Sequence, residues 1–310
     1  MPIAVSLLGC EHPHVADVLG VIASEPDVRL GAVWSGDRSA VPGPVSSYAV
    51  RDPDRAIARA DAVIICAAPD DRPHLAVRAA RAGRPLLVWT PIAVGAAEAS
   101  AVAREIARSR TPAYPSLFLR QLPALGRLRA VLRAELLGRP AAVSAAYLSS
   151  AGLVSPHPAG AAGVSDARRP GVGGMTDLGI HLVDALASLG ASPRLDAISV
   201  DRRARGRTDV GGAGVGRWAD APLSLRASQV VRPGGVELVI NGGGATATLR
   251  DGTLELVGDH GAPERWVGAP PDPAEAVRAF FGRLRTRRLD LNGLRDAIRA
   301  HEVLERAATV

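Results

Sequence analysis

The segment Ile3-Ala4-Val5-Ser6-Leu7-Leu8-Gly9 is a short, mostly apolar run that ends at a glycine. A run of this length and composition is typical of a strand that is buried on both faces of a parallel sheet. Apolar side chains at helical spacing follow, and strand-sized and helix-sized segments then alternate through the first third of the chain. Repeated β-α units with short connections predict a doubly wound parallel sheet, which is the Rossmann architecture.

The loops that follow the strands of such a sheet are where a ligand is expected. The strands expected here cover residues 3–8, 29–34, 62–66, 85–88 and 112–116, and the helices cover 14–23, 55–60, 74–82 and 96–108. Ligands of doubly wound sheets bind beyond the carboxyl ends of the strands. We therefore expect one crevice, lined by residues 9–14, 35–38, 67–71 and 89–92.

The pattern changes after about Leu119, where strands become dominant. Several of them alternate apolar and polar residues, as the strands of an antiparallel sheet with one buried face do. The expected strands are 142–148, 197–201, 224–231, 236–240, 245–249 and 253–257, and the expected helices are 122–137, 177–189, 274–284 and 294–307. A Gly- and Pro-rich loop lies over Ser150–Gly174. We predict a Rossmann domain over 1–118 and an α+β domain over 119–310.

Composition limits the class of protein. Of the 310 residues, 47% are hydrophobic but only 3% are aromatic, so the core must consist of small aliphatic side chains. No apolar run is long enough to cross a bilayer, and no basic segment precedes the first one, which favours a cytoplasmic protein. The two cysteines, Cys10 and Cys66, are too few for a disulfide framework or a zinc site.

The formal net charge is +6, and every fixed cationic side chain is an arginine, because the chain has no lysine. A basic balance is compatible with nucleic-acid binding. However, the arginines are scattered among acids and no ladder of aromatic and basic residues accompanies them. The densest run is Arg202, Arg203, Arg205 and Arg207. We therefore expect neither nucleic acid nor membrane as a partner.

The segment Gly173-Gly174-Met175-Thr176-Asp177-Leu178-Gly179-Ile180-His181-Leu182-Val183-Asp184 resembles the signature of the glucose–fructose oxidoreductase, inositol dehydrogenase and rhizopine-catabolism (Gfo/Idh/MocA) family. The signature has paired glycines, an Asp, a His four residues later and often a second Asp. Similar stretches are 61–69 with His74, 82–88, 138–140 and 240–244. The resemblance implies a Rossmann domain that binds NAD or NADP and a second domain with a large open sheet, often used for homo-oligomer contacts.

Asp177 and His181 are four residues apart on an expected helix, so their side chains share a face. An imidazole beside a carboxylate is a natural general acid and base near neutral pH. The resemblance implies that His181 exchanges a proton with the substrate hydroxyl and that Asp177 orients it or contacts the substrate. The alternative is that the pair only caps and satisfies the helix start.

The turn Trp89-Thr90-Pro91 departs from the family, which usually has Glu-Lys-Pro with the lysine placed between the substrate hydroxyl and the nicotinamide. Thr90 takes the lysine position. A threonine donates and accepts hydrogen bonds, but it carries no charge that lowers the pKa of a hydroxyl. Three readings remain: His181 with Asp177 suffices, an arginine substitutes, or the protein is slow or inactive.

The turn after the first strand departs as well. A dinucleotide fingerprint reads Gly-x-Gly-x-x-Gly, but here only Gly9 stands, and Glu11 and His14 replace the other glycines. The helix N-terminus still offers N–H groups to an anion. A Glu11 carboxylate near the pyrophosphate is unfavourable unless it points away, and His12 and His14 are candidates for phosphate or substrate contacts. We expect no metal site, because no matching carboxylates accompany these histidines.

The end of the second strand bears on the choice between NAD and NADP. Ser35 takes the place of the acid that binds the ribose in NAD-preferring domains, and Arg38 follows. This pattern slightly favours NADP, whereas a shift of register would make Asp37 the ribose ligand. The resemblance adds further candidates by position. Expected cofactor contacts are Ala68, Pro69, His74, Trp89 and Pro91, and expected substrate contacts are Tyr114, Arg120 and Asp184.

Together these features predict an NAD(P)-dependent oxidoreductase that transfers a hydride to or from a secondary alcohol or ketone of a sugar, cyclitol or sugar-derived metabolite. The missing lysine leaves a second class open, a non-catalytic binding or regulatory protein that keeps the fold. A third reading is an oxidoreductase with a non-sugar substrate, such as a tetrapyrrole or an amino-acid-derived imine.

Overall fold

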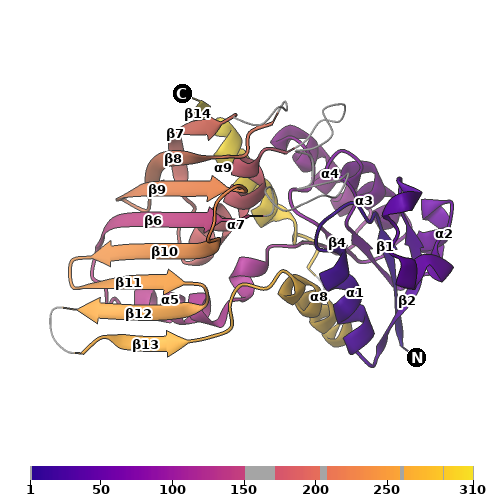
Figure 1. Ribbon diagram of the computed structural model, residues 1–310, viewed down its shortest axis with the longest axis horizontal. Helices are drawn as coiled ribbons and strands as arrows, with labels where there is room; N and C mark the ends of the chain where they lie inside the picture. The colour runs from indigo at the N-terminus through magenta and orange to yellow at the C-terminus, as the bar shows by residue number, and fades with distance from the viewer. Residues whose placement is uncertain (1, 151–171, 203–207, 259–261, 289, 310) are drawn as a thin grey trace. The chain divides into compact units, whose positions relative to one another are not determined.

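Figure 1 shows the computed structural model of the chain, which describes residues 2–150, 172–202, 208–258, 262–288 and 290–309. Contacts divide the chain into two compact units. The first holds the described residues of 2–116 and Pro273–Ile298, and the second holds those of 117–150, 173–272 and 299–309. A helix within the last third of the chain thus belongs to the first unit, although its residues lie in the range predicted for the second domain.

The first unit contains a five-stranded parallel sheet with strand order β2-β1-β3-β4-β5. The strands are β1 (Ile3–Leu8), β2 (Val28–Trp34), β3 (Ala62–Ile65), β4 (Leu86–Val88) and β5 (Ala113–Pro115). Leu8, the last residue of β1, pairs with Trp34 of β2 and with Ile65 of β3. The three strands therefore end at the same edge, which confirms the predicted Rossmann sheet.

The helices of this unit follow the predicted β-α alternation. They are α1 (Val15–Ser24), η1 (Arg38–Ala40), η2 (Gly43–Tyr48), α2 (Pro53–Ala58), α3 (Arg72–Arg81), α4 (Ala96–Arg108) and α8 (Ala274–Thr286). The core beneath them is mainly Val, Leu, Ile and Ala, as the composition requires. Phe280 and Phe281 of α8 lie in this core and are its largest fully buried apolar side chains.

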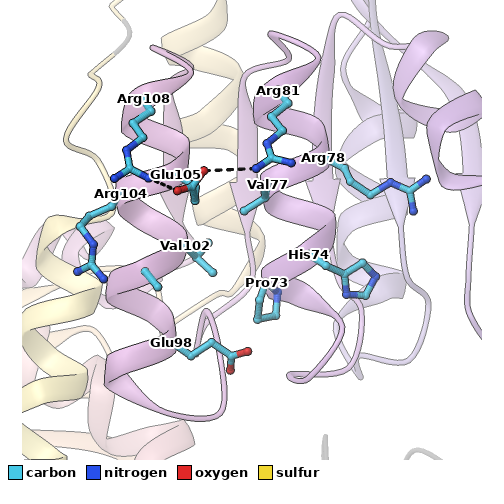
Figure 2. Close-up of a pocket in the computed structure, with 11 residues that line it drawn as sticks. Pro73, His74, Val77, Arg78, Arg81, Glu98, Val102, Arg104, Glu105 and Arg108 are labelled. Atoms are coloured by element: carbon cyan, nitrogen blue, oxygen red, sulfur yellow. Dashed lines mark hydrogen bonds and ion pairs between the residues drawn. The ribbon is translucent and has the colours of Figure 1, made fainter.

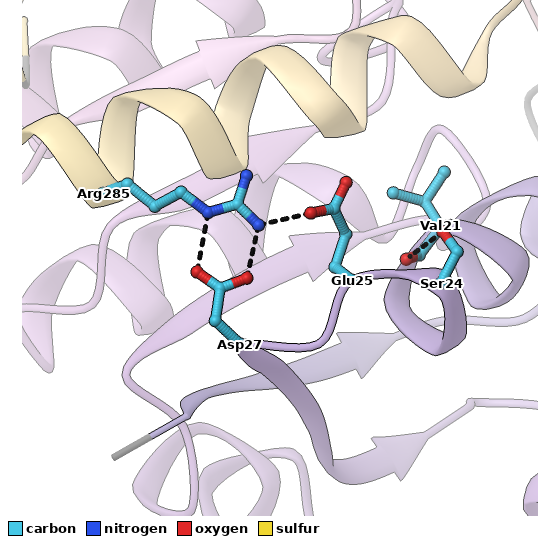
Figure 3. Close-up of polar contacts among 5 residues, drawn as sticks. All are labelled: Val21, Ser24, Glu25, Asp27 and Arg285. Atoms are coloured by element: carbon cyan, nitrogen blue, oxygen red, sulfur yellow. Dashed lines mark hydrogen bonds and ion pairs between the residues drawn. The ribbon is translucent and has the colours of Figure 1, made fainter.

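An arginine fork joins α8 to the start of β2, more than 250 positions earlier in the sequence (Figure 3). Arg285 Nε donates to Asp27 Oδ2 at 2.7 Å, and its terminal nitrogen pairs with the other oxygen of Asp27 and with Glu25. The hydrogen bond from Arg285, followed by its charge, holds the pKa of the Asp27 carboxyl below 3.8. This bidentate geometry is the stronger form of an arginine–carboxylate pair.

The second unit is built on a nine-stranded mixed sheet with strand order β13-β12-β11-β10-β6-β9-β8-β7-β14. The strands are β6 (Pro140–Leu148), β7 (Arg194–Asp201), β8 (Gly211–Trp218), β9 (Ala221–Ser228), β10 (Gly235–Gly242), β11 (Ala245–Arg250), β12 (Thr253–Gly258), β13 (Glu264–Val267) and β14 (Ala308–Thr309). The pairs β6–β9 and β7–β14 are parallel and the other pairs are antiparallel, which confirms the predicted large, mostly antiparallel sheet.

The helical elements of the second unit are η3 (Phe118–Gln121), α5 (Pro123–Arg133), α7 (Gly174–Ser188) and most of α9 (Arg295–Arg306). Helix α7 packs on β6, β8 and β9, whereas α5 packs on β11 and β12. Alternate strand residues such as Leu223 and Leu225 are buried, while Ser224 between them is exposed. The sheet therefore buries one face and leaves Val215 and Val257 exposed.

Three sequence predictions need correction or restriction. The helix expected over 122–137 ends at Arg133, because Glu135 adopts a left-handed φ of 55°. Strands β8, β13 and β14 were not predicted. The predicted loop at 150–174, apart from its ends, and the residues Arg203, Arg205 and Arg207 lie outside the described residues. Within the described ranges, no helix is long and apolar enough to cross a membrane.

Candidate functional site

In the first unit, Gly9 brings the ends of three strands together. Its φ is +87°, and a Cβ there would lie 2.2 Å from the Cα of Ala67 in the loop after β3, so only glycine fits. The Gly9 N–H donates to the carbonyl of Trp34 at 2.6 Å, which ties the turn to the end of β2. The remaining glycine of the dinucleotide fingerprint thus serves the close packing of this edge.

Three rings gather where β1 and β4 end. The ring centroids of His12 and Trp89 are 5.0 Å apart, those of His14 and Trp89 are 5.8 Å apart and stacked, and the two histidines are 5.3 Å apart. His12 Nδ1 accepts the backbone N–H of His14, and His14 Nδ1 lies 2.7 Å from Asp17 Oδ2. The structure therefore brings these predicted cofactor residues together as an aromatic cluster at the crevice edge.

Glu11 is held at the end of β2. Its Oε1 accepts the hydroxyl hydrogen of Ser35 at 2.7 Å and the N–H of Asp37 at 3.2 Å. Ser35 Oγ in turn accepts the N–H of Cys10. Burial, reinforced by the neighbouring Glu11 charge, raises the pKa of the Cys10 thiol to about 12, so this cysteine stays a thiol at neutral pH. Arg38 is exposed in η1.

The turn after β4 is buried and internally bonded. Thr90 has 1% exposure; its N–H donates to Ser116 Oγ at 2.9 Å, and the two side-chain oxygens are 3.1 Å apart. The peptide between Thr90 and Pro91 is cis. The fully buried Arg72 donates to the carbonyls of Ala67 and Pro91, at 2.8 and 2.7 Å. Ser116 and Arg72, which the sequence analysis missed, thus hold the loops after β3 and β4 in place.

Two other predicted site residues of the first unit, Tyr114 and His74, lie in surroundings different from those of the loops described above. Tyr114 packs against Phe280 with ring centroids 5.9 Å apart, and its hydroxyl accepts the N–H of Asp290. Burial raises the pKa of this phenol. His74 is exposed on α3 and lines an open groove of about 570 Å³ against α4 (Figure 2). Ala68 and Pro69 lie in the loop before α3, as predicted.

Several arginines line the groove in Figure 2, and most of them form ion pairs. Arg81 and Arg108 both pair with Glu105, one from each helix, and Arg78 pairs with Asp54. These are exposed pairs, which add little stability and leave little net charge for a ligand. The groove therefore serves mainly as the contact surface of α3 and α4.

In the second unit, α7 begins against the half-buried Asp209. A Cβ on Gly173 would lie 1.9 Å from Asp209 Oδ2, and one on Gly174 would lie 2.5 Å from the carbonyl oxygen of Val210. Asp209 Oδ1 accepts the N–H of Met175 at 2.8 Å, a donor in the first turn of the helix that would otherwise be unsatisfied. Gly173 is thus needed for the approach of this capping carboxylate, and Gly174 for the approach of the Val210 backbone.

The face of α7 that follows carries the predicted acid and base. Asp177 Oδ2 accepts an N–H of Gln229 at 2.6 Å. His181 has 7% exposure, and its ring lies 4.7 Å from that of Phe118 and 6.1 Å from that of Tyr147. Burial, and secondarily the charge of Asp177, raises the pKa of the Tyr147 phenol. The imidazole therefore sits in an aromatic pocket with a carboxylate one helical turn before it.

One turn further, Asp184 binds Arg120. The arginine Nε donates to Asp184 Oδ2 at 2.9 Å and a terminal nitrogen bonds the other oxygen, so the pair is bidentate. Asp184 has 1% exposure, whereas a quarter of the Arg120 side chain is exposed. Removing one partner would leave a buried charge. These two predicted substrate contacts thus bind each other and fix η3 to α7.

Four residues that contact the start and the Asp177–His181 face of α7 were not predicted from the sequence. They are Gln229, Tyr147, Phe118 and Asp209. Gln229 is buried, and its Oε1 has no hydrogen-bond partner among the described residues. The one available signal was that a long amide stands among small residues where β9 ends. Among the described residues, no group of three or more His, Cys, Asp or Glu is placed to hold a metal ion.

No protein-family model matches the chain. No curated protein sequence matches it. Solved structures do match over the whole chain. A 3-ketoreductase from Actinomadura kijaniata, KijD10, solved with NADP and TDP-benzene, is 16% identical with a TM-score of 0.83, covering 100% of this chain and 99% of that one.

Two further matches lead to the same fold. An oxidoreductase from Agrobacterium radiobacter, solved with NAD+, L-tartaric acid and magnesium, is 17% identical with a TM-score of 0.81, over 99% of this chain and 95% of that one. The UDP-N-acetylglucosamine 3-dehydrogenase of Acidithiobacillus ferrooxidans is 20% identical with a TM-score of 0.74, over 98% and 95%. The fold is that of the Gfo/Idh/MocA oxidoreductases. The predicted resemblance is confirmed at the level of the fold.

Proposed function

We propose that the chain is an NAD(P)-dependent oxidoreductase that interconverts a secondary alcohol and a ketone on a sugar, cyclitol or sugar-derived metabolite. The observation that carries the proposal is the α7 face, where His181 lies in an aromatic pocket one turn after Asp177, in a fold whose solved examples hold nicotinamide cofactors. A buried imidazole beside a carboxylate suits proton exchange near neutral pH.

The first unit fits a dinucleotide. Its parallel strands end at one edge, where the turn after Gly9 leads into the N-terminus of α1, a favourable place for a pyrophosphate. Glu11 is held at β2 by Ser35 and Asp37, and its Oε2 is a buried oxygen without a hydrogen-bond partner among the described residues. We propose that the Glu11–Ser35 pair holds the ribose and that Trp89 with His12 flanks the dinucleotide. When bound, the cofactor accepts or supplies the hydride.

In this proposal His181 carries the proton. During oxidation its neutral ring removes the hydroxyl proton as hydride leaves the same carbon, and during reduction the imidazolium returns it. Asp177, held by Gln229 at 2.6 Å, stabilises the protonated ring through its negative charge. Phe118 and Tyr147 restrict the ring orientation and exclude water from it. Thr90 contributes a hydroxyl to hydrogen bonding but no charge.

The structure bears on the arginine alternative to the missing lysine. Arg120 is engaged by both oxygens of Asp184, and Arg72 is buried against two backbone carbonyls. An arginine also has too high a pKa to act as a proton carrier. These contacts support His181 with Asp177 as the machinery that remains when Thr90 replaces lysine.

The substrate class rests on the relatives' chemistry. KijD10 was solved with TDP-benzene, and the Acidithiobacillus protein is a UDP-N-acetylglucosamine 3-dehydrogenase. We propose a polyhydroxylated substrate, a cytoplasmic location and a homo-oligomer that associates through the outer face of the sheet. That face presents Val215 at 57% and Val257 at 46% exposure. Isolated exposed valines are common, so the mass of the protein in solution decides this last point.

The test begins with titration of cofactor-free protein with NADH and with NADPH, followed by a screen of sugars, cyclitols and sugar nucleotides for cofactor oxidation or reduction. Binding of one cofactor together with turnover of a polyhydroxylated substrate supports the proposal. Binding without any turnover supports the non-catalytic alternative, which the replacement of lysine by the buried Thr90 motivates. Turnover of only non-sugar ketones or imines would instead support the third reading.

A further inference from the structure

The Glu11 carboxylate occupies the end of β2, although Glu11 belongs to the turn after β1. Its Oε1 is fixed by two donors from the β2 side, the Ser35 hydroxyl and the Asp37 N–H. Glu11 has 8% exposure, and Ser35 is also buried. The acid that the second strand lacks is therefore supplied from the neighbouring turn, in a fixed position.

The second oxygen of this carboxylate is incompletely satisfied. Glu11 Oε2 is buried and has no hydrogen-bond partner among the described residues, and none of those residues forms an ion pair with it. A buried charged acceptor without a donor costs free energy. The terminal torsion of glutamate is broad, so a small rotation presents this oxygen to a donor at little cost.

A second carboxylate faces the same position. An ideal Cβ on Gly36 would lie 3.7 Å from Glu11 Oε1 and 3.9 Å from Asp71 Oδ2. Gly36 lies two residues after the end of β2, where dinucleotide-binding sheets contact the adenine ribose. A hydroxyl placed here donates to a carboxylate, whereas a phosphate has only acceptor oxygens and meets two negative groups. Arg38, the arginine that follows β2 in the sequence, is exposed and so is screened by solvent.

We propose that Glu11 is a specificity-determining residue that accepts a hydrogen bond from the ribose 2′-hydroxyl and excludes a 2′-phosphate, so that the chain binds NAD(H) in preference to NADP(H). The proposal rests on the proposed dinucleotide function of the same crevice. It reverses the slight preference for NADP that Ser35 and Arg38 suggested from the sequence alone.

The experiment is calorimetric titration of the full chain with NADH and NADPH, for the natural protein, Glu11→Gln, Arg38→Gln and the exposed strand control Glu255→Gln. We expect the natural protein to bind NADH about 10- to 100-fold more tightly than NADPH, the range of a hydrogen bond to a charged group. Glu11→Gln keeps the side-chain shape but loses the charge, and we expect it to bring the two affinities within about threefold of each other. Glu255→Gln should leave the ratio unchanged.

Equal affinities in the natural protein, a preference for NADPH, or an unchanged ratio in Glu11→Gln would overturn the assignment while leaving the dinucleotide function intact. If Arg38→Gln loses NADPH binding and Glu11→Gln leaves the affinity ratio unchanged, Arg38 rather than Glu11 determines the cofactor preference. If neither cofactor binds to the natural protein or to any variant, the proposed function itself fails, and the assignment of Glu11 fails with it. A thermal melt of each variant checks that it is folded.

Discussion

At the scale of single residues, the proposed function depends on polar side chains whose partners are distant in the sequence. Asp177 receives an N–H from Gln229, 52 positions later, and Asp184 binds Arg120, 64 positions earlier. Such pairs fix the rotamers of the groups on α7. A residue at the edge of this network can therefore alter chemistry without touching the reacting atoms.

His181→Gln tests the acid–base assignment with little change in volume. A glutamine cannot exchange the proton, so we expect turnover to fall by about 10²- to 10⁴-fold, the usual contribution of a general acid or base. The dissociation constant of the cofactor should change by less than about twofold, since the cofactor site lies on the other unit's strands. Steady-state kinetics and titration measure the two effects, and unchanged turnover would refute the assignment.

Gln229 is expected to act as a positioning residue for Asp177. Gln229→Ala removes a hydrogen bond to a charged group, and we expect kcat to fall by about tenfold or more with a smaller change in KM. Gln229→Glu places a second carboxylate beside Asp177 and should raise the pKa of the coupled pair, which shifts the acidic limb of the pH–rate profile upward. A uniform loss of activity with an unmoved pH profile would indicate only a structural role.

At the scale of elements, α7 is fixed by a close contact at its first turn. Gly173→Ala would place a methyl group 1.9 Å from Asp209 Oδ2, so the cap must move. We expect the free energy of unfolding to fall by about 1–3 kcal/mol, as overpacking does. Gly126→Ala is the matched control, since Gly126 is exposed on α5 and nothing lies within 4 Å of its Cβ position. It should be neutral or stabilising by up to about 1 kcal/mol.

Chemical denaturation of both alanine variants measures these effects. Equal stabilities for the two would show that Asp209 does not constrain the start of α7. Partial burial raises the pKa of the Asp209 carboxyl, so its ionisation opposes folding as pH rises above the value of 3.8 it has in the unfolded chain. The contact is retained because the same carboxylate satisfies the N–H of Met175.

At the scale of the whole molecule, the chain returns late in its sequence to complete the first unit. Phe280 and Phe281 enter the core there, and Arg285 binds Asp27 and Glu25 (Figure 3). Removal of the C-terminal segment would therefore expose the Rossmann core, although that sheet is built from residues of the first third. The two units cannot be separated by a single cut between them.

Arg285→Gln tests the link between α8 and β2 through its pH dependence. The folded-state pKa of Asp27 is lowered below 3.8, so its stabilising contribution is fully present well above that pH and is lost as the pH falls through the folded value. We expect the variant to melt at a lower temperature than the natural protein at pH 7. The difference should stay constant down to about pH 5 and shrink below it. A difference that does not vary with pH would exclude Asp27 as its source.

Much of the fold was predictable because it depends on local patterns. The buried strands of the first unit are unbroken apolar runs, and α7 shows a helical pattern with Asp177 and His181 on one face. Strand β8 was missed because its residues Gly211, Gly212, Gly214 and Gly216 have little strand propensity. A Cβ at Gly216 would lie 2.0 Å from the carbonyl oxygen of Arg194, so glycine serves the approach of β7.

The sequence by itself determined the two architectures, the edge of the sheet at which we propose that a ligand binds, and the helix that carries Asp177 and His181 on one face. Local apolar periodicity and chain connectivity encode these features. Only the tertiary structure decided that Glu11 reaches the end of β2, that Gln229 donates a hydrogen bond to Asp177 and that Arg120 binds Asp184. Whether two side chains form a hydrogen bond depends on where their strands and helices meet in space. The spacing of the residues along the chain does not give the distance between those side chains in the folded protein.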